Sequence, residues 1–169
     1  MEAFLHCPTA PATIRDRAAA MLSTMRDHLA LSRAYLSAYM ETLGLIPTAF
    51  VNEPRDADGL LRDAEALERL LAAHTRHFPR LLRSVKRVNL CPPAKDCSPR
   101  RRADGYLLQG RMAQEAAHAA LDAHIGLLKQ LIDCGLARQP ELDSARCVAD
   151  ETRRLARLMA RQHSFYSEA

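Results

Sequence analysis

Apolar residues recur along most of the chain at alternating steps of four and three, the spacing of an amphipathic helix. The first such segment runs from about Thr13, an N-cap residue type, to Leu43, and Gly44 follows as a stop. Its predicted inward stripe is Ala18, Leu22, Met25, Leu29, Ser32, Leu36, Tyr39 and Leu43. A loop rich in proline and glycine then separates it from the next segment.

The second segment runs from about Leu60 to Val88, with the stripe Leu60, Ala64, Leu67, Leu71, His74, Phe78, Leu81, Val85 and Val88. Pro79 lies inside it. Proline removes an intrahelical hydrogen bond and clashes with the carbonyl four residues back, so a kink or break is expected near Arg76. Because the stripe stays in phase across Pro79, the pattern favours one proline-kinked helix over two separate helices.

The third segment runs from about Pro99 to Cys134, with Ser98 as its cap and Gly135 as its stop. Its predicted seam is Leu107, Arg111, Gln114, His118, Leu121, Ile125, Leu128 and Ile132. The fourth segment runs from about Pro140 to Phe165, with the seam Val148, Leu155, Met159 and Phe165.

Four long helices with short links predict an all-α, up-and-down four-helix bundle with a proline-kinked second helix. The chain is expected to form one domain over 1–169, with an N-terminal arm at 1–12 and an inter-helix turn at 91–98. An up-up-down-down order needs two links that cross the bundle, and the link at about 135–139 is too short for that. Simple up-and-down connectivity is therefore the prediction.

Composition narrows the class of protein. Apolar residues make 48% and charged residues 26% of 169, as in ordinary globular proteins, and the net charge of +4 favours mild attraction to acidic partners. No stretch approaches the roughly 20 apolar residues of a membrane span, and the N-terminus lacks the pattern of a signal peptide. A cytoplasmic protein without a cofactor is expected. No Gly-rich phosphate loop or nucleophile elbow is present, which speaks against an enzyme.

The stretch CPPAKDCSPRRR, 91–102, holds two of the five cysteines. Zinc is disfavoured because Cys91 and Cys97 are too far apart for a finger pair and no second pair follows. A Cys134–Cys147 disulfide is the alternative to free thiols. The odd cysteine count and the expected reducing compartment favour free thiols.

Two basic groups are candidates for partner binding. Arg100, Arg101 and Arg102 open the third helix, where they oppose the helix dipole; they form either a docking patch or a solvated corner. A stripe on the last helix comprises Arg146, Arg153, Arg154, Arg157 and Arg161. The stripe lacks the interleaved aromatic residues of single-strand binders, so nucleic acid is not the favoured ligand. Arg153, Arg157 and Arg161 are the residues of this stripe selected for a protein partner.

His28, His74 and His118 fall near the middle of their helices, and Glu115 precedes His118 by three. A metal site in a bundle usually has two Glu-x-x-His motifs, and only this one occurs. The alternatives are a mid-bundle metal site and a polar layer of hydrogen-bonded histidines, of which the layer is favoured. The spacings Arg111–His118 and Arg157–His163 resemble the Arg/His pairs of helical ribonuclease toxins, a loose pattern in so arginine-rich a chain.

The function favoured by the sequence is a non-enzymatic adaptor, chaperone or regulator that binds an acidic protein partner. A homodimer is a further option, since small residues in the third helix would suit a helix contact. The alternatives are a secreted, cytokine-like signalling protein and the metal-binding bundle with His28, His74, His118 and Glu115.

Overall fold

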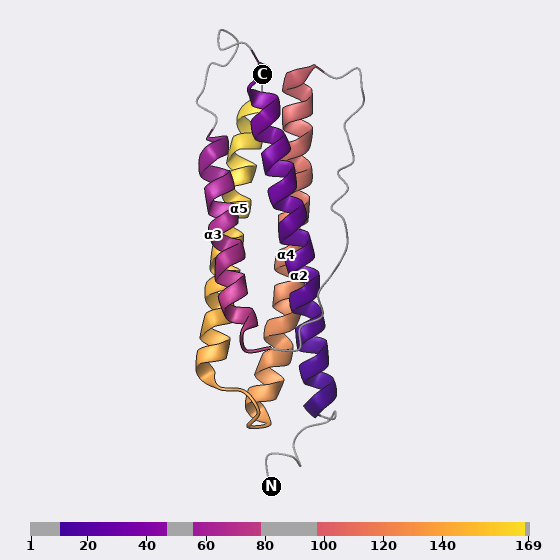
Figure 1. Ribbon diagram of the computed structural model, residues 1–169, viewed down its shortest axis with the longest axis vertical. Helices are drawn as coiled ribbons and strands as arrows, with labels where there is room; N and C mark the ends of the chain where they lie inside the picture. Colours follow the sequence, from indigo (N-terminus) through magenta and orange to yellow (C-terminus); the bar gives the residue numbers. More distant parts are fainter. Residues whose placement is uncertain (1–10, 47–55, 79–97, 168–169) are drawn as a thin grey trace.

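A computed structural model of the chain describes residues 11–46, 56–78 and 98–167. Four helices account for nearly all of these residues: α2 (Pro11–Leu43), α3 (Ala57–Thr75), α4 (Pro99–Asp133) and α5 (Gln139–Ser167). No strand occurs within the described ranges. The prediction of an all-α four-helix bundle is confirmed (Figure 1). None of the described helices is both long enough and apolar enough to cross a membrane.

Local sequence explains where the helices begin and end. Asp56 caps α3 by accepting a hydrogen bond from the Gly59 amide at 2.8 Å, and Ser98 caps α4 through the Arg101 amide at 3.3 Å. At the end of α4, Gly135 has φ of 74°. The Leu136 amide then bonds to the Leu131 carbonyl, which closes a Schellman motif. The stop predicted at Gly135 is therefore confirmed.

The second helix ends before the proline. α3 ends at Thr75, and the turn at 76–78 is closed by a bond from the Phe78 amide to the Thr75 carbonyl at 2.8 Å. In a continued helix, Pro79 would have no backbone N–H to donate to the Thr75 carbonyl, and its ring would clash with that carbonyl. This explains a helix end at this position. The break expected near Arg76 is present. The expected continuation to Val88 lies outside the described residues, as does the turn at 91–98.

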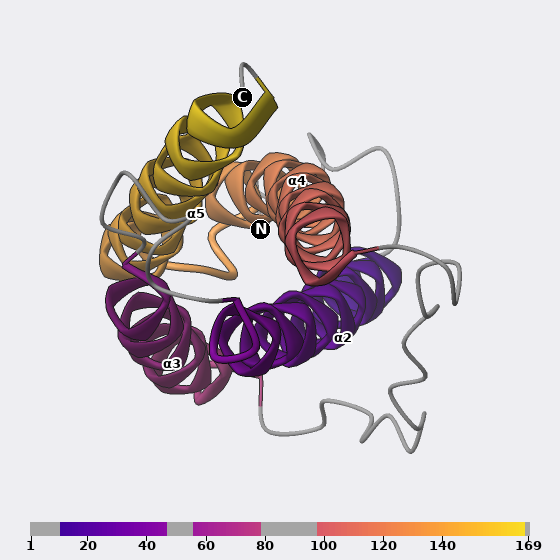
Figure 2. The ribbon, with the colours of Figure 1, turned by 90° about the horizontal axis from the view of Figure 1, so that it is seen from above.

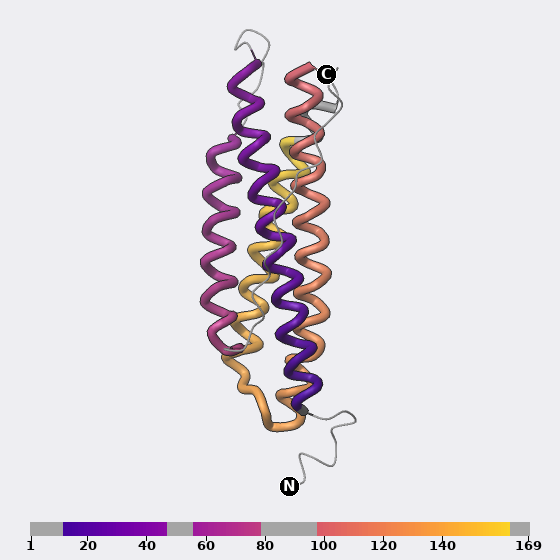
Figure 3. Tube along the Cα trace, turned by 45° about the vertical axis from the view of Figure 1, so that its right-hand side comes forward, coloured from indigo at the N-terminus to yellow at the C-terminus, as the bar shows by residue number. Residues whose placement is uncertain are grey.

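The four helices form a ring in which α2 packs against α3 and α4, and α5 also packs against α3 and α4 (Figure 2). We call the end at which α2 and α5 begin the lower end, as it is drawn in Figures 1 and 3. α3 and α4 both end there, because His77, in the turn directly after α3, contacts Arg15, and His124 of α4 contacts Ala18. The order of directions is therefore up, down, down, up.

This order corrects the simple up-and-down connectivity predicted from the sequence, because consecutive helices α3 and α4 run parallel. The prediction assumed that α3 extends to Val88 and leaves only a short turn. Since α3 has 19 residues, about 28 Å, its end lies far from the start of α4. The 23 residues from Arg76 to Ser98 can reach about 75 Å, which is ample for a link along the bundle.

The predicted stripes of α2, α3 and α5 are buried in the core at nearly every described position. Leu81, Val85, Val88 and Phe165 of these stripes lie outside the residues whose side chains the structure describes. In α4, half of the predicted seam is wrong by one residue. The predicted Arg111, His118, Ile125 and Ile132 are only partly buried. The buried residues are instead their direct neighbours in the sequence, which together with Ala103 form a stripe with seven-residue spacing: Gly110, Ala117, His124 and Leu131. Small residues on this stripe let α2 and α4 approach closely, so this part of the bundle is well packed.

Candidate functional site

Two imidazoles meet in the core near the lower end. His74 of α3 and His124 of α4 are both completely inaccessible to solvent, and their Nε2 atoms lie 2.9 Å apart. The Nδ1 atom of His74 lies 3.1 Å from Ser144 Oγ on α5, and the Nδ1 atom of His124 lies 2.8 Å from the Ala18 carbonyl on α2. One hydrogen-bonded chain thus joins all four helices.

The hydrogen bonds of this four-residue chain all run in one direction when both rings are neutral. The Ala18 carbonyl can only accept, so His124 carries its proton on Nδ1 and its Nε2 is an acceptor. His74 must then donate from Nε2, which leaves its Nδ1 to accept from the Ser144 hydroxyl. The order of donation is Ser144, His74, His124, Ala18. Every polar atom in this buried group is satisfied, as buried polar groups require.

Aromatic and cationic side chains close the site from below. The Phe78 ring packs against both imidazoles, with centroids 6.1 Å from His74 and 5.2 Å from His124. The Arg15 guanidinium lies 5.0 Å above the Phe78 ring and donates to the His77 carbonyl at 2.7 Å. This clamp fixes the end of α3 against α2.

Burial strongly disfavours a charge on either ring. It lowers the pKa of His74 from 6.5 to about 4, and the neighbouring imidazoles of His124 and His77 act in the same direction. Burial also lowers the pKa of His124 to about 4, although its bond to the Ala18 carbonyl opposes the shift. Both rings are therefore neutral at pH 7, in agreement with the fixed direction of the chain.

The order Ser144, His74, His124 has the donors and acceptors of a hydrolase triad but lacks its other requirements. A base with a pKa of about 4 is poorly matched to neutral pH. Ser144 also lies inside α5, where the backbone N–H groups around it bond within the helix and cannot form an oxyanion hole. The arrangement serves as a structural connection better than as a nucleophile.

The residues predicted for a metal site are not brought together. His118 accepts a hydrogen bond from Arg153 at 2.8 Å and lies 3.4 Å from Asp122, while Glu115 pairs with Arg111 at 3.1 Å. Within the described part of the chain, no cluster of three or more His, Cys, Asp or Glu side chains is arranged to hold a metal ion. The His74–His124 pair supplies two ligands, fewer than zinc takes from a protein.

Sequence reasoning identified His74 but missed His124. Of the mid-bundle layer predicted from His28, His74 and His118, only His74 belongs to the buried hydrogen-bonded group. The second histidine of that group, His124, lies about 1.7 turns below His118 on α4, and His28 is only half-buried on α2. A signal was present in the spacing, since Ala103, Gly110 and Ala117 lie at seven-residue steps that lead to His124. The predicted inward stripe instead followed the larger aliphatic residues Ile125 and Ile132, which are next to His124 and Leu131 in the sequence.

The predicted partner-binding arginines lie along α5 and at the start of α4. Arg153 is at the middle of α5, and Arg157 and Arg161 follow toward its upper end, all exposed. In the first turn of α4, Arg101 is exposed, whereas Arg100 and Arg102 are half-buried. Both groups therefore extend toward the same, upper end of the bundle (Figure 1).

The two flanks of α5 differ in charge compensation. On the flank toward α3, Arg154 contacts Glu151 at 3.0 Å and Asp63 at 3.4 Å; these acidic partners, Glu151 first, raise the pKa of Arg154. On the flank toward α4, the partner of Arg153 is the imidazole of His118 rather than a carboxylate. Arg146 and Arg157 form no ion pair with any residue that the structure describes. The α4-side flank is thus a basic surface without acidic neighbours paired to these arginines.

The cysteines differ from the favoured prediction of free thiols. Cys147 is free and exposed, but Cys134 is disulfide-bonded. The alternative bridge, Cys134–Cys147, is therefore also wrong. The other three cysteines, Cys7, Cys91 and Cys97, lie outside the described residues.

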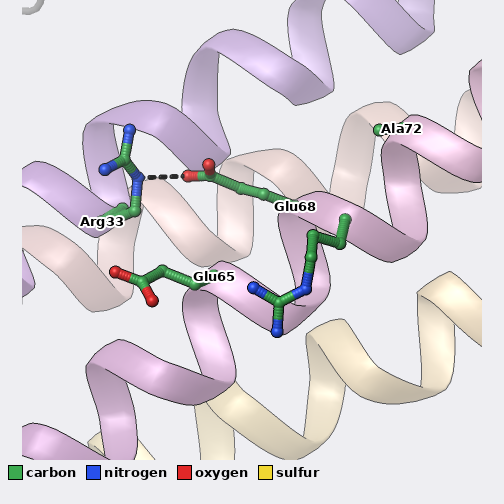
Figure 4. A pocket seen from close by; sticks show the side chains of 5 residues that line it. Arg33, Glu65, Glu68 and Ala72 are labelled. Carbon is green, nitrogen blue, oxygen red and sulfur yellow. Dashed lines mark hydrogen bonds and ion pairs between the residues drawn. The ribbon is translucent and has the colours of Figure 1, made fainter.

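A surface depression lies between α2 and α3, lined by Arg33, Glu65, Glu68, Arg69 and Ala72 (Figure 4). Arg33 points toward Glu68 and is paired with it at 2.7 Å. Two arginines and two glutamates balance each other, so the depression favours neither anionic nor cationic ligands.

Comparison of the chain with protein-family models, with curated proteins and with solved structures finds no match.

Proposed function

We propose that the protein is a non-enzymatic adaptor or regulator that binds an acidic segment of a partner protein. The binding surface is the α4-side flank of α5, with Arg153 and Arg157 at its centre and Arg161 and the turn Arg100–Arg102 toward its upper end. The observation that supports this proposal is the uneven charge on the two sides of α5. Arg154, on the side toward α3, is paired with carboxylates, whereas Arg153 and Arg157 have no acidic partner among the described residues.

Physical chemistry supports an acidic partner for this flank. Arginines at four-residue steps on a rigid helix present a row of planar donors that match carboxylates. Each exposed ion pair contributes about 0.5–1 kcal/mol, so the two pairs of Arg153 and Arg157 contribute about 1–2 kcal/mol and roughly 10-fold in affinity. Such a contribution depends on salt and acts mainly on the association rate.

The test uses charge-removing variants with a neighbouring control. Wild-type protein, the double variant Arg153→Gln/Arg157→Gln and the control Arg154→Gln are used to capture partners from nuclease-treated extract of the native source. We expect wild type and the control to retain the same protein, and the double variant to lose it, with an affinity that falls as salt rises. The proposal would be contradicted if the double variant retained the partner protein, or if wild-type protein retained it only in extract without nuclease treatment.

The disulfide at Cys134 supports a second candidate, a secreted helical signalling protein, because disulfides persist mainly in oxidising compartments. The connectivity speaks against a cytokine-like bundle, whose order is up-up-down-down. Alkylation of protein from the native source, without reduction, distinguishes the compartments. A secreted protein should be modified at Cys147 and protected at Cys134, whereas modification of both favours a reducing compartment.

A further inference from the structure

The hydrogen-bonded chain Ser144–His74–His124–Ala18 can respond to pH, a role separate from the proposed partner binding. Its four members come from α5, α3, α4 and α2, so it holds the lower ends of all four helices at one level. It contains two titratable rings in direct contact and no counter-ion. Within the described residues, no carboxylate or cysteine joins the two rings in a cluster.

We propose that this chain is a proton-operated latch: it holds the lower end of the bundle closed while the two histidines share at most one extra proton, and it opens when each carries one. In the neutral chain each of the three contacts contains one hydrogen, and each hydrogen faces a lone pair.

The first proton is accommodated at the Ser144 end. A proton from solvent binds the lone pair of His74 Nδ1, and the Ser144 hydroxyl turns so that its oxygen accepts instead of donating. The bond from His74 Nε2 to His124 and the bond from His124 Nδ1 to Ala18 stay as they were. Ser144 is partly exposed, whereas both rings are fully buried, so this end is the accessible point of entry.

The second proton cannot be accommodated. Its remaining site is His124 Nε2, which would place two N–H groups against each other across the 2.9 Å contact and two positive charges within one buried pair. The rings must then separate. Because they come from diagonally placed α3 and α4, their separation loosens the lower end rather than one helix alone.

The charged groups around the pair reinforce this outcome. From α2, the Arg15 guanidinium lies over Phe78, which packs on both rings. From the turn after α3, the His77 ring lies 5.7 Å from the His74 ring. α4 contributes His124 itself, and α5 contributes the neutral hydroxyl of Ser144. Among the described residues, the groups that contact the pair are therefore cationic or neutral, and none of them offsets a charge on the pair.

The experiment follows the ring nitrogens and the amides of the full chain between pH 7.5 and 3.5. At pH 7.5, imidazole ¹⁵N shifts should show the Nε2–H form of His74 and the Nδ1–H form of His124. On acidification, hydrogen-exchange protection of amides near Ala18 and His74 should fall at least tenfold further than protection near Tyr39 and Leu107.

The variant Ser144→Asp supplies a carboxylate where His74 Nδ1 gains its proton, with Ser144→Ala as the matched variant without charge. Ser144→Asp should raise the titration midpoint of His74 and move the acid loss of protection at the lower end to lower pH, while Ser144→Ala should not. The surface variant His118→Gln should leave both tautomers and the opening unchanged.

Mixed tautomers for both rings in wild type, or acid loss of protection that is equal at the two ends, would overturn the proposal. An identical His74 midpoint in wild type and Ser144→Asp would overturn it as well. The tautomer measurement needs no substitution, so it decides the matter even if a variant fails to fold.

Discussion

Among single residues, the histidines show how strongly neighbours determine the role of one side-chain type. His74 and His124 are buried and bonded to each other, whereas His118 is held at the surface between Arg153 and Asp122. The sequence places His74 and His118 in equivalent positions of their helices. Only the packing of α4 against its neighbours separates a core residue from a surface residue, because a shift of one residue turns a side chain by about 100°.

The buried pair predicts a specific dependence of stability on pH. Both rings have a pKa of about 4 when folded, against 6.5 as the ordinary value. The unfolded chain therefore binds more protons between these values, so the stabilisation is complete above pH 6.5 and is lost as pH falls toward 4. One ring accounts for at most about 3 kcal/mol. Urea unfolding at several pH values measures this loss.

The double variant His74→Gln/His124→Gln provides the comparison, because its buried amides do not titrate. The difference in unfolding free energy between wild type and this variant should shrink as pH falls from 6.5 to 4. The control His118→Gln should follow wild type. A constant difference over this range would show that the pair does not titrate on folding.

At the scale of elements, α4 is distinguished by the two stripes that it buries. One stripe holds the large residues Leu107, Leu121 and Leu128 with Gln114, and the other holds the small residues Ala103, Gly110 and Ala117 before His124. The Gln114 amide reaches the Thr152 carbonyl at 3.4 Å, which joins α4 to α5. The small stripe permits the close approach of α2, and close approach is what brings His124 to the Ala18 carbonyl.

Two glycines of α4 make this close packing testable. A Cβ at Gly110 would lie 3.0 Å from Met159 Cε and 3.3 Å from Tyr35 Cβ, whereas a Cβ at Gly126 would meet nothing within 4 Å. Gly126→Ala should raise the unfolding free energy by about 0.5–1 kcal/mol through helix propensity. Gly110→Ala should gain less, and Gly110→Leu should lose about 1–3 kcal/mol through overpacking.

Chemical denaturation of the three variants measures these differences. An equal gain for Gly110→Ala and Gly126→Ala would mean that α2 and α4 are not in close contact at Gly110.

For the whole molecule, the parallel course of α3 and α4 has a direct experimental consequence. Replacing residues 79–97 by Gly-Ser-Gly leaves at most about 14 Å between Phe78 and Ser98, about half the 28 Å length of α3. Such a chain cannot form the monomeric bundle and should unfold or exchange helices between copies. Light scattering and circular dichroism detect either outcome.

A 19-residue Gly/Ser replacement of the same segment is the matched control, since it also lacks Cys91 and Cys97 but keeps the length. It should remain a monomeric helical protein. If the three-residue replacement is also a stable monomer, α3 and α4 are joined by a short turn and the observed connectivity is incorrect.

The sequence by itself determined the helices, their caps and most of the core, because these depend on local spacing and on residues such as Ser98, Gly135 and Pro79 that act on their own backbone. It also located His74 on an inward stripe. Only the tertiary structure decided the direction of α4, the burial of His124 and the separation of α5 into a neutralised and a basic flank. These features depend on contacts between residues far apart in the chain, and a helix of mixed small and large residues fits more than one rotation until its neighbours are in place.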